Sequence, residues 1–415
     1  MKRREFVQLA GGMGLSFLLP GLSFADAKKR GKERIKSLIT LWLAGGASQL
    51  ETWDPHAGTL IGGETGSIHT KMNGLQIADM YPQVAEQIHH LSVIRSLTSK
   101  EGDHERGTYY LKTGYRPDPT LIHPSIGAIA AHELPEPGIE IPQHISLLKS
   151  QWPARGGFLG PGLDAFKIQN PGLNLQNMKA LVSGTRQKQR LEGLEKLTSS
   201  FANGRFSRLK RTMHRQTIDR ALTMMRSEQL KAFLIEDEPK AIQNSYGDTR
   251  FGRGCLVARR LVEQGVRAVE VTLKGFDTHA NNYEGHLTQA KILDPAFASL
   301  IDDLKQRDLL DSTVVLCIGE FGRTPQINPV GGRDHWPHGF SCVVGGGGLR
   351  SGVLIGETDI STEKKPPANP IHIPDLYATV FKTLGVDFEF EYDTPIGRPM
   401  RIVDKKARVI QRLVS

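Results

Sequence analysis

The chain has 415 residues and a formal net charge of +9 at pH 7, with 39% hydrophobic and 23% charged residues. This composition is typical of a soluble globular protein, and the length is enough to bury a large core without disulfides. The three cysteines, Cys255, Cys317 and Cys342, are too few and too widely spaced for a disulfide framework. The net positive charge favours anionic partners, but we find no nucleic-acid motif and expect no nucleic-acid partner.

The N-terminus has the organisation of an export signal. It opens with M-K-R-R-E-F and continues with an apolar stretch from Val7 to Phe24, followed by small residues up to Ala27. The adjacent Arg3 and Arg4 are typical of a twin-arginine signal. A short membrane anchor is the alternative, but the apolar stretch is shorter than the roughly 20 residues that span a bilayer. We therefore expect residues 1–27 to be removed, leaving no transmembrane segment, and the protein to be periplasmic or extracellular.

The mature chain, residues 28–415, alternates strand-like and helix-like segments. Buried strands are predicted at Leu38–Leu43, Leu91–Ile94, His144–Leu148, Val266–Leu273, Thr313–Ile318 and Ser341–Val344. Helices are predicted at Gly254–Gln264, Pro295–Lys305 and Pro374–Leu384. Residues 177–243, helical in pattern and rich in Arg and Lys, are interpreted as a basic helical insertion into a single domain. This alternation predicts an α/β fold with a mostly parallel central sheet and helices on both faces.

Carboxylates and histidines gather next to the predicted strands, where ligands of parallel sheets bind. They are Asp54 after the first strand, Asp277 and His279, then Glu320 with Arg323, and Asp334 with His335 before the last strand. Such mixed oxygen and imidazole donors suit a divalent cation such as Zn²⁺, Mn²⁺ or Ca²⁺. We therefore predict a metal site formed by Asp277, His279, Glu320 and His335, with Asp334 and Asp54 as further candidates. The competing interpretation is that these residues are helix caps, turn residues and surface ion pairs.

Three segments resemble sulfatases and the wider alkaline phosphatase superfamily. The strand Thr313–Ile318 followed by G-E-F-G is similar to the superfamily strand that ends in S-D-H-G, and P-D-L-Y-A-T from Pro374 resembles the sulfatase D-L-x-x-T helix. The segment H-E-R-G-T from His104 resembles the nucleophile segment C-x-P-S-R. This resemblance implies an alkaline-phosphatase-like sandwich, with Glu320 at the position of a metal-binding aspartate.

A closer resemblance covers nearly the whole mature chain. It rests on G-G-x-S-x-x-x-T-W-D-P from Gly45, C-L-x-A-R-R-L-V-E from Cys255, F-D-T-H from Phe276, G-E-F-G-R-T-P from Gly319 and G-R-D-H-W-P from Gly332. These motifs are similar to those of the secreted bacterial family named domain of unknown function 1501 (DUF1501). The family name implies no settled reaction.

Together the two resemblances imply a metal-dependent hydrolase of sulfate or phosphate esters. On the sulfatase alignment His104 occupies the nucleophile position, and Thr108 or water activated by the metal are the other candidates. Arg106 or Arg323 would neutralise the oxygens of the transferring group. The expected substrate is an anionic ester, such as a sulfated or phosphorylated glycan.

The sequence also departs from the sulfatase pattern. No Cys or Ser stands at the nucleophile position, and Phe321 replaces the metal ligand that follows the superfamily aspartate. The alternative hypothesis is therefore a catalytically inactive sulfatase-like protein that binds a polyanionic glycan or a protein partner.

The export hypothesis can be tested with the two arginines. Changing both Arg3→Lys and Arg4→Lys should leave unprocessed precursor in the cytoplasm, because the twin-arginine route reads the pair itself. Fractionation and immunoblotting of wild type and double variant give the readout. Normal processing of the double variant would exclude this route.

Overall fold

The structure is a computed structural model that describes residues 36–136, 138–173, 175, 178, 182–202, 214–359 and 366–414. The expected signal peptide, residues 1–27, lies outside these ranges. Over the part of the chain that is described, no helix has the length and apolar character needed to cross a membrane.

A nine-stranded sheet forms the centre of the domain, in the order β12-β4-β11-β8-β1-β7-β5-β6, with β13 also paired to β4. The strands are β1 (Ser37–Ala44), β4 (Leu91–Thr98), β5 (His144–Leu147), β6 (Phe166–Ile168), β7 (Ala268–Lys274), β8 (Thr313–Ile318), β11 (Phe340–Gly346), β12 (Leu354–Ile355) and β13 (Ile371–His372). Only β11 runs antiparallel to its neighbours β4 and β8 within this sheet. The predicted α/β class with a mostly parallel sheet is confirmed.

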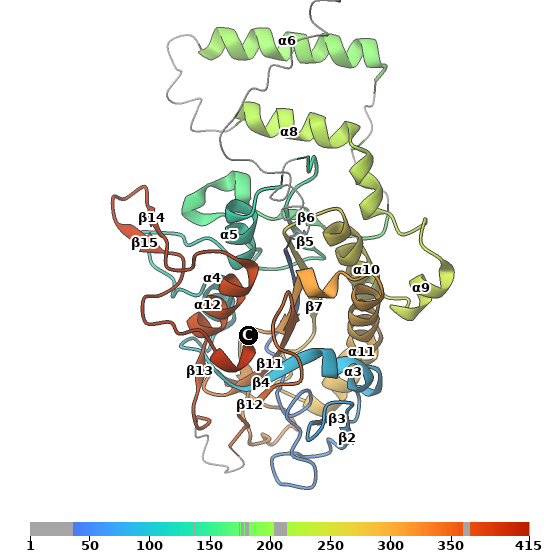
Figure 1. Ribbon diagram of the computed structural model, residues 1–415, viewed down its shortest axis with the longest axis vertical. Helices are drawn as coiled ribbons and strands as arrows, with labels where there is room; N and C mark the ends of the chain where they lie inside the picture. The colour runs from blue at the N-terminus through green and yellow to red at the C-terminus, as the bar shows by residue number, and fades with distance from the viewer. Residues whose placement is uncertain are drawn as a thin grey trace, which may run out of the picture. The chain divides into compact units, whose positions relative to one another are not determined.

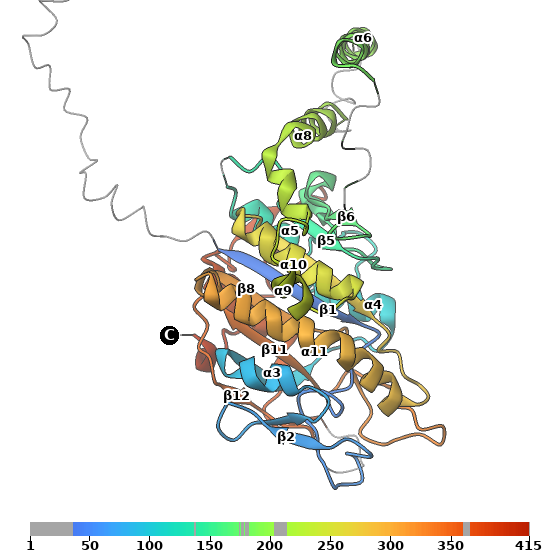
Figure 2. The same cartoon turned by 90° about the vertical axis from the view of Figure 1, so that its right-hand side faces the viewer.

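Helices cover both faces of the sheet, because the side chains of the central strands alternate between two cores. Ile39, Leu41 and Leu43 of β1 pack with α3 (Pro82–Gln87), α10 (Arg250–Glu263) and α11 (Asn282–Gln306). Leu38 and Trp42 of the same strand pack with α4 (His104–Thr113), α5 (Ile126–Glu133) and α12 (Ile373–Leu384). Figure 1 shows the two helical layers on opposite sides of the strands, and Figure 2 looks onto the layer of α3, α10 and α11.

The remaining elements are short hairpins and peripheral helices. The hairpins are β2 (Ser67–His69) with β3 (Gln76–Ala78), β9 (Gly322–Arg323) with β10 (His335–Trp336), and β14 (Glu391–Asp393) with β15 (Pro399–Arg401). The helices are α6 (Gly184–Ala202), α8 (His214–Arg226) and α9 (Lys240–Ser245). Helices α6, α8 and α9 agree with the helical character predicted for residues 177–243. That this segment is an insertion into the domain stays a prediction.

One helix boundary was predicted wrongly. Pro295 was expected to start a helix, as proline often does at the first helical position. It lies instead inside α11, which begins at Asn282 and continues to Gln306. Buried residues on both sides of the proline, such as Leu293 and Phe297, hold the helix against the sheet, and this packing outweighs the missing hydrogen bond.

A buried arginine joins α10 to α11. The side chain of Arg259 is fully buried, and its nitrogens lie 2.8 Å from Glu238 Oε2, 2.7 Å from Glu263 Oε2 and 2.8 Å from Asp303 Oδ2. Removing one partner from such a buried cluster leaves the other charges without compensation.

We expect Arg259→Met to lower the free energy of unfolding by about 3–5 kcal/mol. The matched control is Lys71→Met, since Lys71 pairs with Glu86 at 2.8 Å and both side chains are exposed; the loss there should be below about 1 kcal/mol. Urea unfolding of the three proteins gives the comparison. Equal losses in both variants would contradict a structural role for the Arg259 cluster.

Candidate metal centre

Three loops meet at one edge of the sheet. Strand β1 lies between β7 and β8 and is parallel to both, so the loops after these strands leave from the same edge. The loop after β1 contains two glycines in left-handed conformations, Gly45 at φ 114° and Gly46 at φ 78°. A Cβ atom on Gly45 would lie 2.4 Å from the backbone nitrogen of Asp277. Only glycine therefore allows this loop to approach the loop that follows β7.

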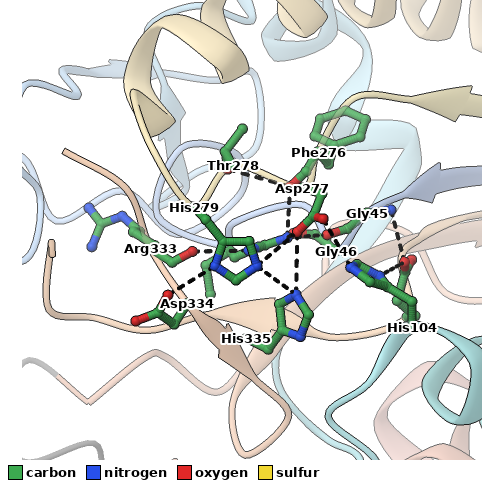
Figure 3. Close-up of polar contacts among 12 residues, drawn as sticks. Gly45, Gly46, His104, Phe276, Asp277, Thr278, His279, Arg333, Asp334 and His335 are labelled. Carbon is green, nitrogen blue, oxygen red and sulfur yellow. Dashed lines mark hydrogen bonds and ion pairs between the residues drawn. The ribbon is translucent and has the colours of Figure 1, made fainter. Parts of the chain in front are cut away.

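Asp277 is the centre of the site (Figure 3). Its Oδ1 lies 3.1 Å from Nε2 of His279 and 3.3 Å from Nε2 of His335, and its Oδ2 lies 3.2 Å from Nε2 of His104. The Nε2 atoms of His279 and His335 are 3.0 Å apart. His104 starts α4, His279 follows β7 and His335 belongs to β10, so residues distant in sequence converge on one carboxylate.

The other ring nitrogen of each histidine contacts an acceptor. Nδ1 of His104 lies 2.9 Å from Glu320 Oε1, Nδ1 of His279 lies 2.9 Å from Asp334 Oδ1, and Nδ1 of His335 lies 2.8 Å from the carbonyl oxygen of Gly102. An imidazole that binds a cation through Nε2 keeps its proton on Nδ1, where an acceptor of this kind receives it. All three Nε2 atoms face Asp277.

The Nε2 atoms of His279 and His335, 3.0 Å apart and facing one carboxylate, need protons or a cation among them. The residue types fit a divalent cation, since imidazole nitrogen and carboxylate oxygen are the common ligands of Zn²⁺. Histidine ligands of metals also commonly donate their second N–H to a carboxylate or a carbonyl, as all three do here. His104, Asp277 and His335 each have a donor atom within 4.8 Å of the other two, and His279 adjoins them.

The neighbouring charges shift the protonation of the cluster. Burial opposes ionisation of Asp277, but the hydrogen bond and charge of Arg323 outweigh it and lower the pKa of Asp277 to about 2. The hydrogen bond to Glu320 raises the pKa of His104 against the effect of its burial. Burial lowers the pKa of His335. Asp277 is therefore an anion at neutral pH, as a metal ligand must be.

Arg323 is directed at the protein rather than at solvent. Its side chain is fully buried and donates to Asp277 Oδ1 at 2.7 Å, to the carbonyl of Gly46 at 2.9 Å and to the carbonyl of Phe276 at 3.1 Å. It also donates to the carbonyl oxygens of Gly45 and Arg333. These contacts fix Asp277 and the loops after β1 and β7. They leave little of the guanidinium free for a substrate.

Glu320 and Asp334 were also predicted as metal ligands. Their carboxylates contact the Nδ1 atoms of His104 and His279, on the side of each ring that faces away from Asp277. Glu320 is 1% exposed, and its Oε1 also accepts a 2.9 Å hydrogen bond from the backbone N–H of Gly45. Its Oε2 is buried and has no hydrogen-bond partner among the described residues. In this arrangement the two carboxylates orient the imidazoles of His104 and His279.

Asp54, the further candidate ligand, has other partners. It is buried, lies 3.0 Å from Nη1 of Arg95 and accepts a 2.5 Å hydrogen bond from the backbone N–H of Thr358. Its contacts connect the loop after β1 to β4 and to the segment after β12. They do not bring it to Asp277.

The expected nucleophile segment forms the first turns of α4. His104 joins the cluster through Nε2, and Thr108 is 2% exposed. Arg106 is exposed, with Nη2 2.6 Å from Glu101 Oε2 and Nε 3.5 Å from Asp103 Oδ2. Of the four residues predicted to act on the substrate, Arg106 is therefore the most exposed to solvent.

Sequence reasoning missed two contributors to this site. The carbonyl of Gly102 holds His335, and Trp152 stacks parallel to the His104 ring, with centroids 6.4 Å apart. The strand before Gly102 was predicted to end at Ile94, whereas β4 continues to Thr98. With the longer strand, Gly102 and His104 would have been recognised as residues that follow a carboxyl end of the sheet.

The comparisons with known proteins agree with the resemblance seen in the sequence. A family model described as "Protein of unknown function (DUF1501)" matches residues 35–414. No curated protein matches the chain.

Similar solved structures include the lipoteichoic acid synthase LtaP from Listeria monocytogenes, at 10% identity and a TM-score of 0.40, covering 85% of this chain and 73% of that chain. The PsFucS1 sulfatase from Pseudoalteromonas sp. has 12% identity and a TM-score of 0.40, with 88% and 70% covered. The phosphonate monoester hydrolase SpPMH from Silicibacter pomeroyi has 9% identity and a TM-score of 0.40, with 91% and 76% covered.

Proposed function

We propose that this chain, which belongs to the DUF1501 family because the family model matches residues 35–414, is an exported metal-dependent hydrolase of sulfate or phosphate esters. The observation that carries the proposal is the set of three imidazoles around Asp277. Their Nδ1 atoms are held by acceptors, and their Nε2 atoms converge on one carboxylate. Helix caps and surface ion pairs alone would not be expected to direct the Nε2 atoms of three histidines at one carboxylate.

The residues that would hold the cation are His104, Asp277, His279 and His335. This mixture of imidazole nitrogen and carboxylate oxygen favours Zn²⁺ over the oxygen-preferring Ca²⁺. A divalent cation in such a site supplies Lewis-acid chemistry toward an ester oxygen and makes water more acidic. The side chains of Asp277 and His279 are each 48% exposed, so a substrate can reach the cluster from solvent.

The residues around the ligands would orient them and bind the substrate. Glu320, Asp334 and the Gly102 carbonyl orient the imidazoles, and Arg323 orients Asp277. Arg106, exposed on the first turn of α4, is the group suited to the anionic oxygens of the ester.

Water is the nucleophile that fits this site. Thr108 is buried, and the cysteines Cys255, Cys317 and Cys342 are buried as free thiols. His104 has its Nε2 directed at Asp277, so its free lone pair is not available to attack a substrate.

The metal assignment is tested by metal content. His104→Ala, Asp277→Asn and His335→Ala should each abolish stoichiometric zinc, since each removes a ligand. Glu320→Gln should weaken zinc affinity by about 10–100-fold, because it removes a partner of a ligand. His90→Ala is the matched control, since His90 precedes β4 and so lies at the opposite edge of the sheet. Elemental analysis of purified, folded proteins gives the readout.

The same proteins test the reaction. Zinc-loaded wild type should hydrolyse 4-nitrophenyl sulfate or 4-nitrophenyl phosphate, and Asp277→Asn should not. Zinc bound without hydrolysis of either ester would favour the catalytically inactive, glycan-binding alternative. Full zinc content in all of the variants would exclude the metal centre.

A further inference from the structure

A cavity with cationic side chains in a partly apolar lining opens beyond the carboxyl ends of β5, β6 and β7. It has a volume of about 340 Å³, within the range of small-molecule sites. Phe251, Leu273 and Ile292 provide its apolar lining, and Gln169 and Asn170 contribute side-chain amides. Its size and mixed lining suit one sugar unit, because a sugar ring has apolar C–H faces and polar hydroxyl groups.

The charges that line this cavity are all positive. Lys149 follows β5, Lys274 ends β7 and Arg250 begins α10, and all three are exposed. None of them forms an ion pair with a residue that the structure describes, and the described lining of the cavity contains no carboxylate. Three cations of separate elements that face one cavity without a counter-charge repel one another and attract an anion.

A larger cavity elsewhere provides the contrast. It has a volume of about 680 Å³, and its lining has both cations and carboxylates: Lys100, Arg116, Arg398, Lys406, Asp118, Asp375 and Asp404. The three carboxylates offset most of the charge of the four cations. The cavity beyond β5–β7 differs from it in having three cations and no carboxylate among its described lining residues, so the basic composition of the chain alone does not explain its charge.

This cavity and the metal centre share one strand and one sheet edge. Lys274 is the last residue of β7, and Asp277 follows it after only two intervening residues. The geometry points to a second anion site that binds a sulfate or phosphate ester group carried by a neighbouring unit of the substrate. This inference rests on the proposed function, and it adds that the substrate carries at least two anionic ester groups.

The test measures anion binding without relying on catalysis. Calorimetry on the chelator-treated full chain would use glucose 6-sulfate, sodium sulfate and sodium phosphate as ligands, with sodium chloride matching the ionic strength. In Arg250→Gln/Lys274→Gln, glucose 6-sulfate should bind at least about tenfold more weakly, since two charged contacts are lost. Both side chains are exposed, so the double variant should fold.

The matched control is Arg398→Gln/Lys406→Gln, which removes the same charge from the larger cavity and should bind glucose 6-sulfate as wild type does. Equal weakening in the two double variants would overturn the site, because binding would then follow net charge alone. Binding of inorganic ions without glucose 6-sulfate would overturn the assignment to a substrate group.

The anion-binding test and the zinc-content test can fail independently of each other. His104→Ala should lose zinc and keep anion binding, whereas Arg250→Gln/Lys274→Gln should keep zinc and lose anion binding. If wild type binds no zinc but passes the anion test, the proposed hydrolase fails while the anion site stands. Loss of glucose 6-sulfate binding in His104→Ala alone would overturn the second site.

Discussion

The contact between Arg323 and Asp277 is the constraint on which the rest of the site depends. The guanidinium is fully buried and holds one carboxylate oxygen at 2.7 Å while it also donates to the carbonyls of the loops around it. An arginine placed there can neither leave nor lose its charge, so Asp277 stays ionised and fixed. Three imidazoles from three different elements are then arranged around that carboxylate. The metal chemistry we propose follows from this arrangement, because each imidazole has its Nε2 directed inward.

The sheet topology explains why such distant residues meet. β1 lies between β7 and β8, so the residues after these strands emerge together, and Gly45 and Gly46 let the loops pack closely. A second buried arginine, Arg333, precedes Asp334 in the chain and pairs with Glu51, with Nη2 2.8 Å from Glu51 Oε1. The loops that carry the ligands are therefore held by buried charges as well as by apolar packing. Such rigid support suits a site that must keep its geometry when a substrate approaches from solvent.

Much of this arrangement could be predicted from the sequence, and the missing parts have physical reasons. Apolar runs such as Thr313–Ile318 identified the buried strands, and the polar residues after them identified the edge that holds Asp277, His279 and His335. The partners of individual side chains could not be read in this way. Asp54 pairs with Arg95 and Glu320 with His104, and each pair is joined only by the tertiary fold. The three cations that line the cavity beyond β5–β7 likewise come from segments with no common motif.

The measurement that tests the metal centre most directly is X-ray absorption spectroscopy at the zinc edge of the purified, zinc-loaded protein. We predict a first shell of nitrogen and oxygen donors at about 2.0–2.2 Å, with the outer-shell scattering of several imidazoles and without sulfur. A shell that contains sulfur would place the ion at the buried cysteines, and a shell of oxygen alone would place it on surface carboxylates. Either result would contradict a centre built from His104, Asp277, His279 and His335.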